Sequence, residues 1–336
     1  MEPTSTVDAT RNHRSPTGRL NTTGSRSPGS FARVEASTWQ RLASEHVARA
    51  ERWTTPRLAR RKLGQTNPVE DFLFEYYPFS PAKLRTWHPG YGVVLEGVDA
   101  EEYLRFDAYI RVPDGVTADV LALRSKRERL DLAVRILAGT RSRQPHRGCF
   151  ALHEWAMTYG LEQQEVRHPA LPLRVSPSTI AATIETIGLR CTHIDAYRFF
   201  TPDATPLNTL VPTRATQPDL EQPGCLHASM DLYKVASWFS PLVSSELVLR
   251  CFENAAFARM LDMRASPYDV TAYGLDPIRI ETLQGRRQYA EEQDLVIQRS
   301  EPIRAELLMV LEELREELVA VEAAVSPDRA RSTGTH

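Results

Sequence analysis

Apolar residues recur at helical spacing along most of this chain, and this pattern predicts a mainly helical protein. The first run follows Ser37, where we expect a helix to begin, and contains Trp39, Leu42, Val47, Ala50 and Trp53. The same spacing predicts helices at 69–77, 100–111, 116–139, 150–159, 244–263 and 289–324, and one that begins at Leu226. Pro302 is expected to interrupt the 289–324 helix.

Two short segments have the pattern of strands instead. Residues 190–200 alternate between apolar and polar positions, which would place His193 and Asp195 on the same side of a strand. Residues 278–281 are a second candidate strand. Residues 201–224 carry five prolines and read as a long loop, a kind of segment that often serves in binding.

These elements predict a mainly α fold with a few short strands, in a single large catalytic domain over 37–325. Residues 1–36 lack apolar periodicity and are rich in Ser, Thr, Pro, Gly and Arg, so we expect a disordered tail there. Residues 326–336 read as a polar tail. The apolar face of the C-terminal helix indicates a capping element or a homodimer contact.

Charge and composition narrow the classes of function. The net charge of −2 carries no overall signature of a nucleic-acid binder, although local basic runs such as 57–62 and 124–147 could contact an anionic partner. A solvated helix face is the default interpretation of those runs. No apolar run is long enough for a membrane span, and four cysteines without a signal peptide indicate reduced thiols in a cytoplasmic protein.

Three polar clusters between residues 149 and 231 are the best candidates for chemistry. Each joins a cysteine to a histidine and a nearby carboxylate: Cys149-His153-Glu154, Cys191-His193-Asp195 and Cys225-His227-Asp231. Imidazole supplies a nitrogen ligand and carboxylate supplies charge, so His153, His193 and His227 are candidate ligands of divalent iron, manganese or zinc. Asp195 or Asp231 would complete the ligand set. The cysteines themselves read as small core residues.

Several segments resemble an actinobacterial family whose members are labelled 3-methyladenine DNA glycosylases; the resemblance spans roughly residues 37 to 310. The segments that carry it are 67–74, 84–92, 153–157, 193–202, 222–227 and 261–269. It implies a DNA-repair hydrolase that cleaves the N-glycosidic bond of a damaged purine, with DNA or a nucleobase-containing molecule as its substrate. A carboxylate would then stabilise the transition state or activate water, and Glu154, Asp195 and Asp231 are the candidates.

Nearby polar side chains are candidate substrate-binding residues: Arg190, Tyr197, Arg198, Tyr233, Lys234 and Arg264. Two other interpretations stay open beside the glycosidase. One is a metal-dependent enzyme that acts on a small molecule or nucleoside through the histidine and carboxylate cluster. The other is a non-enzymatic binding protein, in which each histidine is only hydrogen-bonded within a polar core.

Overall fold

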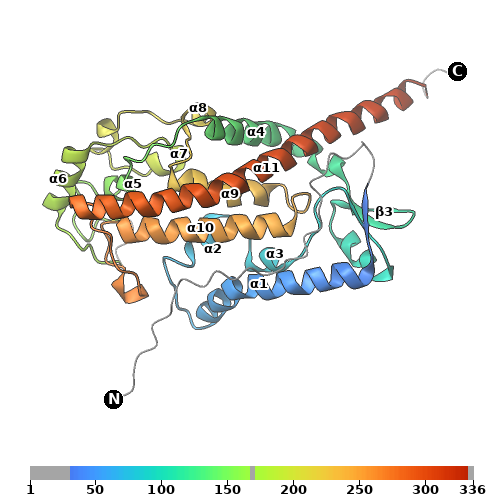
Figure 1. Ribbon diagram of the computed structural model, residues 1–336, viewed down its shortest axis with the longest axis horizontal. Coiled ribbons are helices and arrows are strands. Elements are labelled where there is room, and N and C mark those ends of the chain that lie inside the picture. The colour runs from blue at the N-terminus through green and yellow to red at the C-terminus, as the bar shows by residue number, and fades with distance from the viewer. Residues whose placement is uncertain (1–30, 167–170, 332–336) are drawn as a thin grey trace, which may run out of the picture.

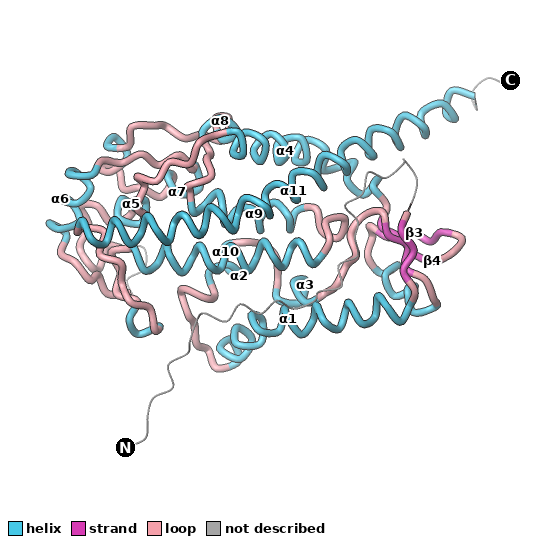
Figure 2. Tube along the Cα trace, in the orientation of Figure 1, coloured by secondary structure: helices cyan, strands magenta, loops and turns pink. Residues whose placement is uncertain are grey.

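The computed structural model describes residues 31–166 and 171–331, and within them the fold is mainly α with one small sheet, as predicted (Figure 2). The sheet lies at one end of a set of long helices, and the loop-rich segments gather at the other end. None of the helices in the described residues is long and apolar enough to cross a membrane. The candidate chemistry of residues 149–231 belongs to the loop-rich end and to the helices beside it.

Three helices form the centre of the molecule: α9 (Leu226–Trp238), α10 (Ser245–Ala265) and α11 (Leu283–Arg331). Helix α10 packs against both of the others, and α4 (Arg127–Ser142) packs on α11 (Figure 1). Ten of the 13 residues of α9 are buried, so this helix has no polar outer face. The polar residues of α9 are therefore forced into the interior.

Helix α1 (Ala36–Lys62) runs along the side of α10, with α2 (Phe72–Tyr76) and α3 (Pro81–Arg85) between them. The predicted helix after Ser37 is confirmed, but Glu35 occupies the cap position and makes no side-chain cap bond. Two arginines of the basic run 57–62 turn inward and bond the buried carboxylate of Asp71. This part of the run is a structural ion-pair network.

The sheet has the strand order β1-β2-β4-β3. Strand β1 (Ala32–Val34) is parallel to β2 (Val93–Leu95), and β2 is antiparallel to β4 (Gly115–Ala118). Strands β3 (Tyr109–Val112) and β4 form a hairpin. Because β1 lies within residues 1–36, ordered structure begins earlier than we expected; residues 1–30 lie outside the described part of the chain.

The expected helices at 100–111 and 116–139 are only partly correct. In their place are a 3-10 helix, η1 (Val98–Arg105), the β3–β4 hairpin, a second 3-10 helix, η2 (Val120–Lys126), and then α4. The hairpin turn holds Pro113, which cannot continue a helix, and Gly115, whose φ of 151° and close approach to the Leu95 carbonyl leave no room for a Cβ atom. These two turn residues therefore favour a hairpin, although the apolar residues around them recur at helical spacing.

The loop-rich end holds short helices: α5 (Leu152–Ala156), α6 (Pro177–Ile187), α7 (Ile194–Tyr197), η3 (Thr205–Leu207) and α8 (Gln217–Leu220). The strand expected over 190–200 is wrong, because α7 occupies its second half. In its first half, the side-chain amide of Asn208 bonds both backbone groups of Cys191 and so takes the place of a neighbouring strand.

Two expectations near the C-terminus are also wrong. Residues 278–281 form no strand, and they lead from the 3-10 helix η4 (Thr271–Tyr273) towards α11. Helix α11 continues through Pro302 and extends to Arg331, so residues 326–331 are helical. An internal proline costs a helix about 3 kcal/mol, and the burial of apolar side chains beyond it, such as Leu307, Leu311 and Leu314, offsets that cost.

Candidate metal centre

The three histidines of the polar clusters meet in the interior. His153 comes from α5, His193 directly precedes α7, and His227 lies on α9. The ring centroids of His153 and His227 are 4.5 Å apart, and those of His193 and His227 are 5.2 Å apart. All three side chains are buried. The sequence clusters therefore converge on one place, where the ring of His227 contacts both of the other rings.

The backbone before α5 is strained. Phe150 and Ala151 have φ angles of 46° and 56°, a left-handed conformation that non-glycine residues rarely adopt. Such a conformation persists only when the surrounding packing holds it, and it occurs preferentially at functional sites. Here it forms the turn that leads into α5 and so fixes the position of His153.

His153 belongs to a group with two carboxylates. Its Nε2 atom lies 2.9 Å from Oδ1 of Asp262 on α10, and a carboxylate oxygen of Glu154 completes a set of ligand atoms within 4.8 Å of one another. Arg259 donates to the other oxygen of Asp262, at 2.8 Å, and to Glu154, at 3.0 Å. The arginine holds both carboxylates in place.

His193 belongs to a second group of the same composition. Its Nε2 atom lies 3.1 Å from Oε1 of Glu221 and 3.3 Å from Oδ2 of Asp231. Tyr77 donates to Oδ1 of Asp231 at 3.0 Å, and the amide of Gln217 donates to Glu221 at 2.6 Å. Both carboxylates are thus oriented by hydrogen bonds from outside the group.

The contacts inside the two groups are short, but they are not hydrogen bonds. Nε2 of His153, Oδ1 of Asp262 and both ring nitrogens of His193 are buried without a hydrogen-bond partner, as is Nδ1 of His227. A buried polar atom without a partner is costly, so native proteins rarely leave one. Nε2 of His153 and Oδ1 of Asp262 face each other, as two ligands of one cation would. The oxygens that face His193 accept hydrogen bonds from Gln217 and Lys234.

Electrostatics at the two groups also favour a positive charge. Burial opposes protonation of His153 and His193, but the facing carboxylates outweigh it: the pKa of His153 rises well above its usual value, and that of His193 rises to about 9. For His227, burial and the two neighbouring histidines lower the pKa, so its ring is neutral. A neutral imidazole is the form that binds metals, so an ion bound at either group would displace the proton from His153 or His193.

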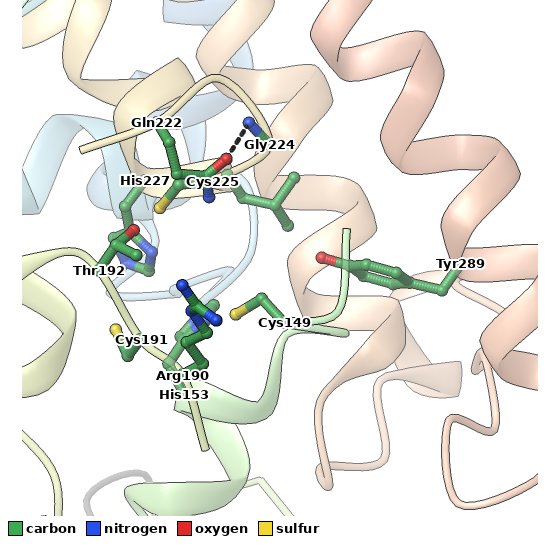
Figure 3. Close-up of a pocket in the computed structure, with 11 residues that line it drawn as sticks. Cys149, His153, Arg190, Cys191, Thr192, Gln222, Gly224, Cys225, His227 and Tyr289 are labelled. Carbon is green, nitrogen blue, oxygen red and sulfur yellow. Dashed lines mark hydrogen bonds between the residues drawn. The ribbon is translucent and has the colours of Figure 1, made fainter. Parts of the chain in front are cut away.

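A small pocket opens onto two of these histidines (Figure 3). Its walls include His153 and His227 together with three free thiols, those of Cys149, Cys191 and Cys225. Its volume of about 10 Å³ is close to the minimum for one water molecule. Three of the four cysteines thus line a cavity beside the histidines, a role that the interpretation as core residues did not foresee.

Asp195 lies next to the His193 group without belonging to it. Its carboxylate, which is buried, forms ion pairs with Arg198, Arg214 and Lys234. Lys234 also pairs with Asp231, so this lysine joins Asp195 to the group. Asp231, and not Asp195, is therefore the aspartate that faces His193.

The predicted substrate-binding residues are only partly brought together. Arg190 lines the small pocket that holds the three cysteine thiols, and Tyr233 is fully buried against Tyr77. Tyr197 packs on Phe200. The guanidinium of Arg264 is engaged elsewhere, by the carboxylate of Glu292 and the backbone carbonyl of Asp276.

Sequence reasoning missed four residues that complete the groups: Glu221, Asp262, Tyr77 and Arg259. Glu221 directly follows α8, inside the proline-rich segment 201–224 in which the sequence singles out no residue. Arg259 and Asp262 are one helical turn apart on α10, and both are buried, but their spacing alone matches that of an ordinary surface ion pair. No sequence signal connected them to His153.

Comparisons with models of protein families, with curated proteins and with solved structures find no significant match to this chain. What the protein does is therefore inferred from the geometry of its own side chains.

Proposed function

We propose that this protein is a metal-dependent enzyme that binds a divalent ion at each of its two histidine and dicarboxylate groups and acts on a small molecule. The group of His153, Glu154 and Asp262 would hold one ion, and the group of His193, Glu221 and Asp231 would hold the other. His227 supplies a further neutral nitrogen between them.

One observation carries this proposal: the contacts of the histidine Nε2 atoms. Their distances to the carboxylate oxygens are 2.9, 3.1 and 3.3 Å, yet none of these contacts has hydrogen-bond geometry. Two ligands that bind one ion at about 2.1 Å and at right angles to each other lie about 3.0 Å apart. The spacing and the missing hydrogen bonds both support ligation of a common ion.

A histidine elsewhere in the chain shows the contrast. His46 is also buried and also contacts a carboxylate, that of Glu246 at 3.3 Å. That contact has hydrogen-bond geometry, and the other ring nitrogen of His46 bonds the Leu84 carbonyl at 2.9 Å. A merely structural histidine in this protein thus has both ring nitrogens satisfied.

The donor atoms favour iron or manganese. Each group offers one nitrogen and two carboxylates, whereas structural zinc sites are usually completed by thiolates or further histidines. A metal ion bound there would act as a Lewis acid or lower the pKa of a bound water. Arg259, Tyr77 and Gln217 would keep the carboxylates oriented, and the buried setting would limit the access of bulk water.

The glycosylase activity implied by the resemblance is a proposal with less support. Glu154 is ion-paired to Arg259, and Asp195 and Asp231 are ion-paired to Lys234. The pocket beside the histidines has room for about one water molecule, and a flipped purine is several times larger. Release of a base from alkylated DNA by the metal-free protein would favour the glycosylase over the metal-dependent enzyme.

The test is the metal content of the purified protein, measured by plasma mass spectrometry after loading with Fe(II), Mn(II) or Zn(II) and removal of free ions. We expect about two ions per chain in the wild type. Asp262→Asn and Glu221→Gln should each lose about one ion, because each removes a charged ligand from one group only. His46→Gln is the matched control and should keep both.

A wild-type protein that holds no metal under any of these conditions would contradict the proposal. So would full metal content in both the Asp262→Asn and Glu221→Gln variants. Metal binding without turnover of any small molecule would favour the non-enzymatic binding protein. Circular dichroism of each variant shows whether a loss of metal reflects a loss of fold.

A further inference from the structure

A second small cavity adjoins the His193 group. Two of its walls are the carboxylates of Glu221 and Asp231, and the cationic side chains of Lys234 and Arg304 also line it. The remaining wall is mostly apolar and comes from α4 and α9, with Ile136, Leu137, Val235 and Trp238. The cavity therefore combines two cations and two carboxylates with an apolar surface.

Arg304 stands out in this cavity because part of its buried guanidinium has no hydrogen-bond partner. It lies on α11 and has no solvent-exposed surface. Its Nη1 atom donates to Glu301 at 3.0 Å, but Nε and Nη2 are buried with no hydrogen-bond partner. Burial lowers the pKa of this arginine, although a guanidinium stays charged at any ordinary pH. A buried cation with free donors calls for an anionic partner.

The shape of those donors narrows the choice of partner. Nε and Nη2 of a guanidinium form one edge of a planar fork, and a carboxylate matches that edge with two parallel hydrogen bonds. The cavity volume of about 10 Å³ is that of a single water site, so a carboxylate group, which is larger, enters only when the surrounding side chains move apart. The apolar wall suits a methyl or a short alkyl group.

We propose that this cavity is the subsite for the carboxylate of a small organic acid, with Arg304 as its main binding residue. The inference rests on the proposed metal-dependent function, because an ion held by His193, Glu221 and Asp231 would offset the negative charge that faces the ligand. Lys234, which pairs with Asp195 and Asp231, is a second cation in the lining. The substrate class of the enzyme is then a small carboxylic acid that reaches the ion at this group.

The probe for the test is acetate, and acetamide is its neutral counterpart of the same shape. Binding is measured by isothermal titration to the metal-loaded protein at constant ionic strength, with chloride as the background anion. We expect acetate to bind and acetamide not to bind. Arg304→Met should weaken acetate binding on the order of tenfold to a hundredfold, as expected when hydrogen bonds to a charged group are lost.

Arg250→Met is the matched control. Arg250 lies on α10, is partly buried, and pairs with Glu306, but it does not line the cavity. It should leave acetate binding unchanged. If Arg304→Met does not fold, Arg304→Lys keeps the charge and removes the planar fork, and it should still weaken acetate binding.

Equal acetate binding by wild type and the folded Arg304 variants would overturn the inference. Equal binding of acetate and acetamide would overturn it as well, and so would displacement of acetate by an equal concentration of chloride. Tighter binding of inorganic phosphate than of acetate would reject the carboxylate as the ligand. Metal content is measured on the same samples: two bound ions without any acetate binding would refute only this inference, whereas the absence of metal would refute the proposed function.

Discussion

The phenol of Tyr77 offers the sharpest test of the His193 group. Tyr77 is buried and donates to Oδ1 of Asp231 at 3.0 Å, while Oδ2 of the same carboxylate faces His193. Burial and the nearby Asp231 carboxylate raise the pKa of Tyr77 well above its usual value, so the phenol stays protonated and can donate. Tyr77→Phe removes this hydrogen bond and keeps the ring that packs against Tyr233.

The size of the effect follows from the charge of the acceptor. A hydrogen bond to a charged group contributes about 1.5–3 kcal/mol, so we expect the free energy of unfolding of the metal-free protein to fall by that amount. Loss of a group that orients a metal ligand weakens metal binding about 10–100-fold. The weakening should affect one of the two proposed ions, because Tyr77 bonds only the His193 group.

Tyr109→Phe is the matched control. Tyr109 is also buried, and its hydroxyl lies 3.1 Å from Nδ1 of His88, a neutral partner far from both groups in the sequence. Its loss should cost about 0.5–1.5 kcal/mol and leave metal binding unchanged. Urea unfolding measures the stabilities, and competition with a fluorescent chelator measures the affinities. Equal metal affinities for wild type and Tyr77→Phe would refute the reasoning, and so would an equal loss in the control.

Three further predictions concern the stability of the fold outside the two histidine and dicarboxylate groups. Asp71→Asn should destabilise the protein by about 3 kcal/mol in urea unfolding, because it leaves two arginines of α1 without their buried partner. Burial lowers the pKa of His88 to about 4, below the value near 6.5 of the unfolded chain, so stability should fall by up to about 3 kcal/mol as the pH drops from 6.5 towards 4. His88→Phe should remove that part of the pH dependence. Gly139→Ala should destabilise α4 where an alanine normally stabilises a helix, because its Cβ would lie 2.3 Å from the Pro218 carbonyl; a raised melting temperature would contradict this.

The sequence by itself determined the helical class and indicated three histidines that the fold gathers in the interior. The apolar spacing placed α1, α9 and α10 correctly, because long helices bury one continuous face and so leave a period in the sequence. The pairing of histidine with carboxylate in three nearby segments identified His153, His193 and His227, and in the structure the ring of His227 contacts the other two.

Only the tertiary structure decided which carboxylates face those histidines. Asp195 is two residues from His193 in the sequence, yet α7 turns it towards Arg214 and Lys234, while Glu221 and Asp231 take the place beside the ring. Asp262 reaches His153 from a helix more than a hundred residues away. Such partners leave no local period or spacing, because packing between distant elements creates the contact. The same holds for Arg304, whose burial follows from the way α11 packs against α4 and α9.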